Sequence, residues 1–526
     1  MLKYIAFILL LLCGGGVRGQ ALHVDSNCFL PTDKCCAEIS SAIPTTDKGI
    51  FFIGAMVRKP GGGVPFLPID TVMGNVMVGK LDSNRQLSWV KVFGGRDDDL
   101  AFKACQTPDG GYAVLALTLS NDGDVTGNKG GGDIWLLRTD ANGNLLWQKT
   151  YGSSYSDDPI SIANTADHGF IILGTTNGSD GDVPFHYGGF FSSDWLVIKT
   201  DSTGNVLWTK NIGGTESEGN RGQILAVDSF YYLIGSTASR DYDCIPSSWQ
   251  SGADMYDDYY VIKLNDTGAV LWDSSYGGSR NDEAESAMID RRDNTIMITG
   301  TTYSNDHMVT DYNGGNGDIW VVKVKMDGTL VWQKALGITS DETGSSLCIT
   351  PPGEYIICGN TRYVIGGGDG WLSVLDTTGN EIYRKIFGGI ENEAVFSIVQ
   401  SKNGYAAAGG SASDLFTEGL NCNANNSGSF ISYFERWPLS IPFIAENGIS
   451  MIAYPNPVNK ELIIKLPNAV TGSITVLNSI GQTILVSAVE RESCIKIPVE
   501  NWSTGLYFLS FQSESKQINT IKILKN

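Results

Sequence analysis

DIWLLRTDANGNLLWQKTYG occupies residues 133–152, and close variants of this phrase recur along most of the chain. The copies are DWLVIKTDSTGNVLWTKNIGG at 194–214, DYYVIKLNDTGAVLWDSSYGG at 258–278, DIWVVKVKMDGTLVWQKALG at 318–337 and DGWLSVLDTTGNEIYRKIFGG at 369–389, with a weaker copy at 75–95. A period of about sixty residues indicates a repeat architecture. The phrase therefore decides the fold before any single residue does.

Each repeat holds four short apolar runs that are separated by turn residues. In the repeat that starts at Ala101, the runs read AFKACQT, YAVLALT, DIWLLRT and LLWQKTY. Asp-Gly and Asn-Gly pairs lie between such runs, and these pairs are strong signals of β-hairpins. Each repeat is therefore predicted to form a four-stranded antiparallel meander.

Residues 134–137 and 319–322 are apolar at successive positions, so these strands must be covered on both faces. Stacking of sheets around an axis supplies both covers, which predicts a β-propeller, whereas no 3.6-residue period supports a helical solenoid. The second run of the repeat occurs seven times, but the Trp-bearing fourth run occurs only six times. We predict seven blades over residues 20–437, the first starting at residues 36–44. A segment near the N-terminus or residues 437–444 would complete the last blade.

The repeated core resembles the bacterial seven-bladed β-propeller repeat of secreted proteins. The resemblance covers residues 36–437 and rests on the D-I-W, G-N-L-L-W and Tyr-Gly-Gly segments of the phrase. It implies the fold class, an all-β propeller. It does not imply a function, because propellers serve as enzymes, lectins and scaffolds alike.

The first nineteen residues have the features of a secretory signal peptide. Lys3 supplies a positive charge, residues 5–12 are apolar, and Val17 and Gly19 fit a cleavage site before Gln20. A lipoprotein signal with Cys13 as the acylated residue is the alternative. The apolar run is too short to span a bilayer, and no longer one follows, so we expect no transmembrane segment in the mature chain.

The formal net charge of −20 argues against nucleic acid as a partner, because the phosphate backbone would repel the chain. We expect a monomer.

Disulfides are permitted in an exported protein. Cys348 and Cys358 flank the turn at 351–354, so they are either a disulfide across a hairpin or two small buried residues.

After a linker at 438–450, residues 451–526 contain several short strands and are predicted to form a small Ig-like β-sandwich. This stretch is similar to the type A C-terminal sorting domain of cargo proteins of the type IX (Por) secretion system of Bacteroidetes. The matching positions are Tyr454, Pro455, Asn456, Pro457, Gly481, Gly505, Tyr507, Lys522 and Lys525. Asn478 departs from the Asp that is usual there, but Asn can fill the same turn.

The resemblance of this domain implies export through the N-terminal signal and recognition by the type IX machinery at the outer membrane. Removal of the domain would follow, with release of the protein or its attachment to the cell surface.

One loop in the propeller has the spacing of a calcium-binding loop. Its oxygen-bearing residues stand at positions 1, 3, 5 and 12 with a glycine at 6, and Ca²⁺ takes six or more oxygen ligands from a tight turn. The candidate metal ligands are Asp122, Asp124, Thr126, Asn128 and Asp133. The alternative is an Asx-rich turn that closes through the Asp133 side chain.

A second acidic set precedes the first strand of most repeats. It comprises Asp97, Asp98, Asp99, Asp157, Asp158, Glu216, Glu218, Asp282, Glu283, Asp341, Glu342, Glu391 and Glu393. These side chains either form a cation site at the channel mouth or accept backbone N–H groups from neighbouring blades. Their occurrence in nearly every repeat favours the structural role.

No catalytic residue is predicted, because the four histidines lie at unrelated repeat positions and no G-x-S-x-G or H-E-x-x-H motif occurs. The longest departures from the repeat are residues 240–257 and 186–193. Tyr242, Trp249 and Tyr256 in the first segment are the predicted ligand patch. We expect a noncatalytic module that binds protein or glycan; the alternative is a secreted carbohydrate-active hydrolase or lyase that uses carboxylates.

Overall fold

The computed structural model describes residues 19–23, 35–58, 74–189, 192–244, 256–362, 367–387, 392–402, 404–411, 428–435, 452–454, 458, 460–478, 482–503, 505–513 and 518–525. The chain divides into two compact units, and the boundary lies between Arg436 and Trp437. Every regular element in the described ranges is a β-strand. No helix among these residues is long and apolar enough to cross a membrane.

The described residues of the first unit form seven four-stranded antiparallel sheets. In chain order the strands are β2 (Cys35–Pro44), β3 (Ile50–Arg58), β4 (Gly74–Leu81) and β5 (Leu87–Phe93); β6 (Asp99–Gln106), β7 (Tyr112–Thr118), β8 (Asp133–Thr139) and β9 (Leu145–Tyr151); β10 (Asp157–Asn164), β11 (Phe170–Thr176), β12 (Asp194–Thr200) and β13 (Val206–Ile212); β14 (Gln223–Val227), β15 (Phe230–Thr237), β16 (Asp258–Asn265) and β17 (Val270–Tyr276); β18 (Asp282–Asp290), β19 (Thr295–Thr302), β20 (Asp318–Lys325) and β21 (Leu330–Leu336); β22 (Glu342–Ile349), β23 (Tyr355–Arg362), β24 (Gly368–Leu375) and β25 (Glu381–Phe387); and β26 (Glu393–Ser401), β27 (Gly404–Ser411) and β28 (Gly428–Glu435) with β1 (Gly19–His23).

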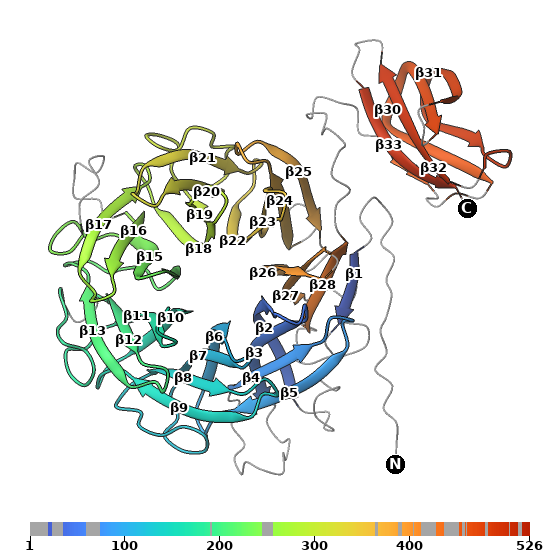
Figure 1. Cartoon of the computed structure of the whole chain (residues 1–526). Coiled ribbons are helices and arrows are strands. Elements are labelled where there is room, and N and C mark those ends of the chain that lie inside the picture. The colour runs from blue at the N-terminus through green and yellow to red at the C-terminus, as the bar shows by residue number, and fades with distance from the viewer. Residues whose placement is uncertain are drawn as a thin grey trace, which may run out of the picture. The chain divides into compact units, whose positions relative to one another are not determined.

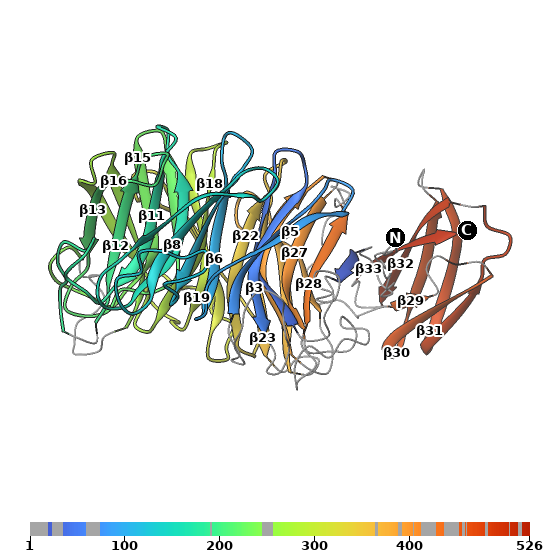
Figure 2. The same ribbon diagram turned by 90° about the horizontal axis from the view of Figure 1, so that it is seen from below.

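The sheets are arranged around a common axis like the blades of a propeller, with the first strand of each meander innermost (Figure 1). Seen from the side, neighbouring sheets lie face to face (Figure 2). The last sheet has the order β1-β28-β27-β26, so a strand from the N-terminal region forms its outer edge. This is the first of the two closures expected from the sequence.

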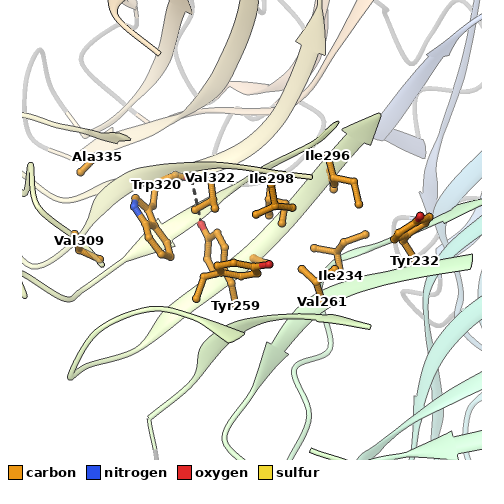
Figure 3. Packing of buried hydrophobic residues seen from close by; sticks show 14 residues of the cluster. Tyr232, Ile234, Tyr259, Val261, Ile296, Ile298, Val309, Trp320, Val322 and Ala335 are labelled. Carbon is orange, nitrogen blue, oxygen red and sulfur yellow. Dashed lines mark hydrogen bonds between the residues drawn. The ribbon is translucent and has the colours of Figure 1, made fainter. Parts of the chain in front are cut away.

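The third strand of the repeat is a strand covered on both faces, as its unbroken apolar run predicts. All seven residues of β8 and all seven of β12 are buried. Aromatic rings of neighbouring sheets pack against each other. The ring centroids of Tyr259 and Trp320, for example, lie 4.7 Å apart. The Tyr259 hydroxyl donates a hydrogen bond of 3.2 Å to the Trp320 carbonyl (Figure 3). Burial of such large rings supplies most of the stabilisation between sheets.

The tryptophan of the fourth strand packs against the turn of the next repeat, which explains why both recur. Trp147 lies against Gly204, and a Cβ at that glycine would overlap the indole ring. Gly204 also has a φ of 81°, a conformation that favours glycine. Trp208 donates a hydrogen bond of 3.0 Å from Nε1 to the Asp266 carbonyl in the next sheet. The D-x-x-G turn and the tryptophan are thus two halves of one contact between blades.

Cys348 and Cys358 are free buried thiols, which decides between the two possibilities left open by the sequence. In the register of β22 and β23, Cys348 lies opposite Ile356 and Cys358 lies opposite Ser346. The two cysteines therefore do not face each other across the hairpin. Burial raises the pKa of the Cys348 thiol to about 12, which keeps it protonated and unreactive.

The second unit contains β29 (Ile452–Tyr454), β30 (Glu461–Asn478), β31 (Thr483–Pro498), β32 (Gly505–Ser513) and β33 (Ile518–Lys525). Four of these strands follow the order β29-β30-β32-β33, and β31 pairs with β30 in the same five-stranded sheet. Ile464, Val476, Leu509 and Ile523 are fully buried and belong to one hydrophobic cluster. This unit therefore has its own core.

Candidate functional site

The innermost strands of the propeller direct side chains toward the axis through a repeated β-bulge. The register shifts once in each of six inner strands, β2, β6, β10, β18, β22 and β26, close to the middle of the strand. A bulge leaves one residue unpaired and re-aims its side chain. The unpaired residues are Ser40, Phe102, Ile160, Glu285, Ser345 and Phe396. Ile160 is buried between sheets, whereas the other five residues, two serines, two phenylalanines and one glutamate, line one cavity.

The fourth sheet departs from this pattern. Its inner strand β14 begins late, at Gln223, and pairs with β15 without a register shift. An isolated bridge joins Glu218 to Thr237 ahead of it, so residues 219–222 form an excursion between two paired segments. Arg221 lies in this excursion and reaches the carboxylate of Glu285 on β18 in an ion pair. The Arg221 side chain is 65 % exposed and the Glu285 side chain is 18 % exposed.

These residues line an open cavity of about 850 Å³, whose wall is formed by the first and second strands of several sheets. One part of its wall is apolar and includes Leu100, Phe102 and the 44 % exposed Phe396. The polar part of the wall is formed by Ser40, Lys103, Arg221, Glu283, Glu285, Thr301, Tyr303, Thr343, Ser345 and Asn360. A concave site with apolar walls and a few convergent polar groups is typical of ligand-binding sites.

The charges in the cavity nearly balance one another. Burial raises the pKa of Glu285, although Arg221 opposes this shift. The charge of Glu285 in turn raises the pKa of Arg221. Burial lowers the pKa of Lys103, with Glu285 acting in the opposite direction. Burial and the nearby Glu283 raise the pKa of Tyr303, so its hydroxyl stays protonated.

The sequence missed Arg221, Glu285 and Lys103 as site residues, although Glu283 was within the predicted acidic set. A signal was present in the inner-strand runs, where a charged residue stands at a position that other repeats fill with serine or an apolar residue. Reading that signal requires knowledge of the bulge, because the bulge decides which residue of the run faces the axis.

The predicted calcium loop lies between β7 and β8, and its carboxylates point to separate backbone donors. Asp122 accepts a hydrogen bond of 2.9 Å from the N–H of Arg96, and Asp124 accepts one of 3.1 Å from Gly94. Asp133 accepts one of 2.9 Å from Lys129. Within the described ranges, no three His, Cys, Asp or Glu side chains come together in a way that could hold a metal ion.

The other two predicted ligands make contacts of the same kind. Thr126 accepts a hydrogen bond of 2.5 Å on its hydroxyl from the Gln148 amide, and Asn128 accepts one of 3.0 Å from the N–H of Gly130. The loop therefore closes on itself and on the preceding linker between blades through side-chain oxygens, as an Asx-rich turn would.

The first acidic residue of the inner strand accepts hydrogen bonds at the junction between two sheets. Asp282, for example, accepts one of 2.8 Å from the N–H of Gly278 and one of 2.9 Å from the hydroxyl of Ser304. Equivalent backbone contacts are made by Asp99, Asp157 and Glu342. These residues are buried, so they fill the structural role that their repetition indicated.

At four junctions this acid meets a second buried carboxylate at the head of the third strand in the preceding sheet, whereas Asp99 meets the amide of Asn75. The point where a Cβ on Gly152 would sit lies 2.7 Å from an oxygen of Asp133 and 2.7 Å from an oxygen of Asp157. The corresponding pairs are Asp194 with Glu218, Asp258 with Asp282 and Asp318 with Glu342. Two buried carboxylates at close range disfavour ionisation of both.

The pKa values of these pairs follow from burial. Burial raises the pKa of Asp194 to about 6 and that of Glu218 to about 7. It raises the pKa of Asp133 and of Asp318 to about 6. One oxygen of Asp133 and one of Asp318 are buried without a hydrogen-bond donor, which a proton held between the two carboxyls would satisfy.

Two of the three residues of the predicted ligand patch are exposed aromatic side chains. Tyr242 is 68 % exposed and Tyr256 is 38 % exposed, while Trp249 lies outside the described residues. Tyr242 stacks on Tyr187, with ring centroids 4.6 Å apart and an interplanar angle of 19°. Phe185 contacts Tyr187 edge to face at 4.9 Å. The structure thus brings together the two segments that depart most from the repeat.

The positions that resemble a sorting signal are distributed over the edges of the second unit. Tyr454 ends β29, and Gly505 begins β32, where it lies opposite Lys525 on β33. Lys522 lies opposite Phe508 in the same ladder. Tyr507 is buried and donates a hydrogen bond of 2.8 Å to the Ser503 carbonyl. Pro455, Asn456, Pro457 and Gly481 lie outside the described residues.

Asn478 closes the turn after β30, where Asp is usual in such domains. Its side-chain oxygen accepts a hydrogen bond of 2.9 Å from the N–H of Gln482. Its own N–H donates one of 2.9 Å to the Gln482 carbonyl. The amide thus makes the turn contact that the sequence analysis expected of it.

Residues 452–526 match the family described as the secretion system C-terminal sorting domain, the Por secretion tail. The regulatory protein FlaEY of Caulobacter vibrioides is 22% identical over 219 residues, which are 40% of this chain and 23% of that protein. This chain therefore spans less than a quarter of that relative's length.

Solved structures with a similar course of the chain include the β-propeller domain of the Trilobed protease from Pyrococcus furiosus. It has a TM-score of 0.39 and 10% sequence identity, and the match covers 71% of this chain and 91% of that one. A fungal alcohol oxidase of the AA5 family, in complex with copper, has a TM-score of 0.41 and 12% identity over 94% of this chain and 99% of the other.

The sorting domain fixes the destination of the protein. The chain is a cargo of the type IX secretion pathway and is secreted or attached to the cell surface. Its first unit is an all-β, propeller-like array of four-stranded sheets.

Proposed function

We propose that the protein is a noncatalytic binding or scaffold module for protein or glycan, carried to the cell surface or medium by type IX secretion. Its first unit is a complete seven-bladed propeller, with β1 as the outer strand of the last blade. The signal peptide at 1–19 directs the first export step. The second unit is an Ig-like, type A sorting domain, and the mature protein is a monomer.

The observation that supports a binding role is the composition of the central cavity. Most contacts between blades use the same residue types in each repeat, but the cavity wall does not. Phe102, Glu285, Ser345 and Phe396 stand at equivalent bulges, so the wall is aromatic in two blades, acidic in another and hydroxylic in a fourth. A wall that varies from blade to blade breaks the symmetry of the propeller and can recognise an asymmetric ligand.

A hydrolase or lyase is the second candidate, because Glu283, Glu285 and Tyr303 gather in the same cavity. A glycosidase needs one carboxyl group that gives a proton and one that stays ionised. Glu285 is bound to Arg221, so it is poorly placed to act as a proton donor. The raised pKa of Tyr303 disfavours the phenolate that a lyase base would require. Both facts favour binding over turnover.

The test uses the mature chain from Gln20 onward in a glycan array and in a pull-down of surface proteins. The matched variant carries Arg221→Ala and Glu285→Ala, which removes both members of the ion pair together and leaves Glu283 as the carboxylate in the cavity with Lys103. We expect a specific ligand for the wild type and its loss in the variant. Degradation of a polysaccharide by the wild type would support the enzyme instead.

Calcium bound by the loop from Asp122 to Asp133 is a separate proposal. The residues carry enough oxygens for Ca²⁺, although in the structure these oxygens accept N–H groups. Thermal melting with calcium and with a chelator tests the proposal. It predicts a lower midpoint with the chelator, and an unchanged midpoint would contradict it.

A further inference from the structure

The loop between the second and third strands contains the same turn in four blades. Its first residue is an aspartate whose carboxylate accepts a backbone N–H from the linker that enters the blade. The contacts are Asp122 with Arg96 at 2.9 Å, Asp180 with Ser154 at 2.7 Å, Asp241 with Thr215 at 2.8 Å and Asp306 with Ser279 at 2.9 Å. This turn is therefore part of the repeated frame.

The residue after the aspartate has a positive φ in all four blades. Gly123 and Gly181 occupy the position in the second and third blades, with φ of 66° and 62°. Tyr242 and His307 occupy it in the fourth and fifth, with φ of 53° and 54°. Residues with a Cβ are disfavoured in this conformation, and a bulky side chain there is uncommon. The turn thus favours glycine, and Tyr242 adopts a backbone conformation that is unfavourable for a tyrosine.

Packing does not explain the tyrosine. The side chain is 68 % exposed, so it buries little surface in return for the unfavourable φ. One face of its ring lies on Tyr187, and Phe185 supports Tyr187 from the side. Tyr242, Tyr187 and Phe185 therefore form an aromatic stack, and the exposed side chain of Tyr242 is its outer member. Strain at an exposed aromatic residue is a feature of functional sites.

The carboxylates beside the stack define the chemistry of its partner. Asp241 and Asp243 flank Tyr242. Asp241 accepts hydrogen bonds from the N–H and the hydroxyl of Thr215, which leave its negative charge in place, and the ion pairs among the described residues include neither carboxylate. The charge of Asp243 contributes, after burial, to a raised pKa of Tyr187, which shows that the charge lies close to the stack. A cation over an aromatic face gains from the ring quadrupole and from nearby negative charge.

We propose that the stack of Tyr242, Tyr187 and Phe185 is a docking surface for a lysine or arginine side chain of a partner protein. The proposal rests on the binding role proposed above and assigns it a second surface, separate from the central cavity. A neutral glycan could also lie on an aromatic face and donate hydroxyl hydrogen bonds to these carboxylates, but it would gain no charge–charge attraction from them.

The test compares Tyr242→Gly with His307→Gly in the mature chain. Both variants place glycine in the same turn at the same backbone conformation, so both should keep or raise the thermal midpoint. Binding of an arginine-rich decapeptide is measured by calorimetry at low and at moderate salt. We expect Tyr242→Gly to weaken binding about tenfold, as the loss of a desolvated cation–π contact would, and His307→Gly to leave it unchanged.

Three results would overturn the proposal. The peptide could bind both variants and the wild type equally, as a diffuse attraction to the acidic surface would produce. Tyr242→Gly could lower the midpoint, which would give the tyrosine a structural role. Neutral oligosaccharides could bind in a Tyr242-dependent manner while the peptide does not. The double variant of the central cavity is tested separately on surface ligands. A negative result with the peptide therefore rejects the docking surface but does not reject the proposed binding function.

Discussion

The junctions between blades and the central cavity are built on opposite principles. Four of the junctions repeat one arrangement, a buried carboxyl pair beside a glycine, as at Asp194, Glu218 and Gly213. At the cavity most blades share the bulge, but the residue that it presents is serine, phenylalanine or glutamate, depending on the blade. The difference indicates that repeated positions close the ring, whereas departures from the repeat carry recognition. Substitutions at the junctions should therefore change stability, and those at the cavity should change binding.

The largest loss of stability is expected from the cores of the junctions. Trp195 is fully buried and donates a hydrogen bond of 2.9 Å to the Gly219 carbonyl. Trp195→Ala should lower the free energy of unfolding by about 3–5 kcal/mol, because it leaves a large cavity. Urea denaturation measures the change. Leu207→Ala on the neighbouring outer strand is the control, since Leu207 is exposed, and equal losses in both would contradict the assignment.

The carboxyl pairs predict a dependence of stability on pH. The folded pKa of Glu218, about 7, lies above the ordinary value of 4.5. The protonated group therefore stabilises the fold fully below about pH 4.5, and this contribution is lost as the pH rises through about 7. Glu218→Gln cannot ionise, so at pH 8 it should be more stable than the wild type, on the order of 3 kcal/mol.

Melting curves from pH 4 to pH 8 measure this effect, and Glu216→Gln is the control, because it removes the same charge two residues away. A wild type whose midpoint does not fall over this range, or a Glu218→Gln variant that falls equally, would show that the pair carries no shared proton.

A smaller effect is expected from the glycine that separates the carboxyls. A Cβ at Gly213 would overlap oxygens of both Asp194 and Glu218. Gly213→Ala should cost about 2 kcal/mol, because the junction must shift to admit the methyl group. Gly189→Ala, where a Cβ would meet nothing within 4 Å, should have no comparable effect in the same denaturation assay. A tolerated methyl group at Gly213 would mean that the carboxyls can move apart freely.

The smallest effect on stability is expected in the cavity. Arg221 is largely exposed, and ion pairs of this kind contribute about 0.2–1 kcal/mol. Arg221→Ala together with Glu285→Ala should leave the urea midpoint nearly unchanged. A loss of stability comparable to that of Gly213→Ala would show that the ion pair of Arg221 and Glu285 stabilises the fold rather than serving ligand binding.

The sequence predicted the meander of each repeat, because Asx-Gly turns and doubly apolar strands are local signals. It also indicated that the acids before the inner strands accept backbone N–H groups. It could not place Arg221 beside Glu285, since these residues are 64 positions apart and meet only because the inner edges of two neighbouring sheets lie side by side. Nor could it pair Tyr187 with Tyr242, because stacking depends on how two loops of neighbouring blades lie in space. Recognition of the sorting domain depended instead on the order of its short motifs, which is a linear property.

The central claim is that recognition resides where the repeat breaks. The most direct measurement is the pull-down of surface ligands with three forms of the mature chain: the wild type, Gly213→Ala, and the double variant Arg221→Ala with Glu285→Ala. We predict that Gly213→Ala lowers the melting midpoint but keeps the ligand below that midpoint, and that the double variant keeps the midpoint but loses the ligand. Retention of full binding by the double variant would contradict the claim.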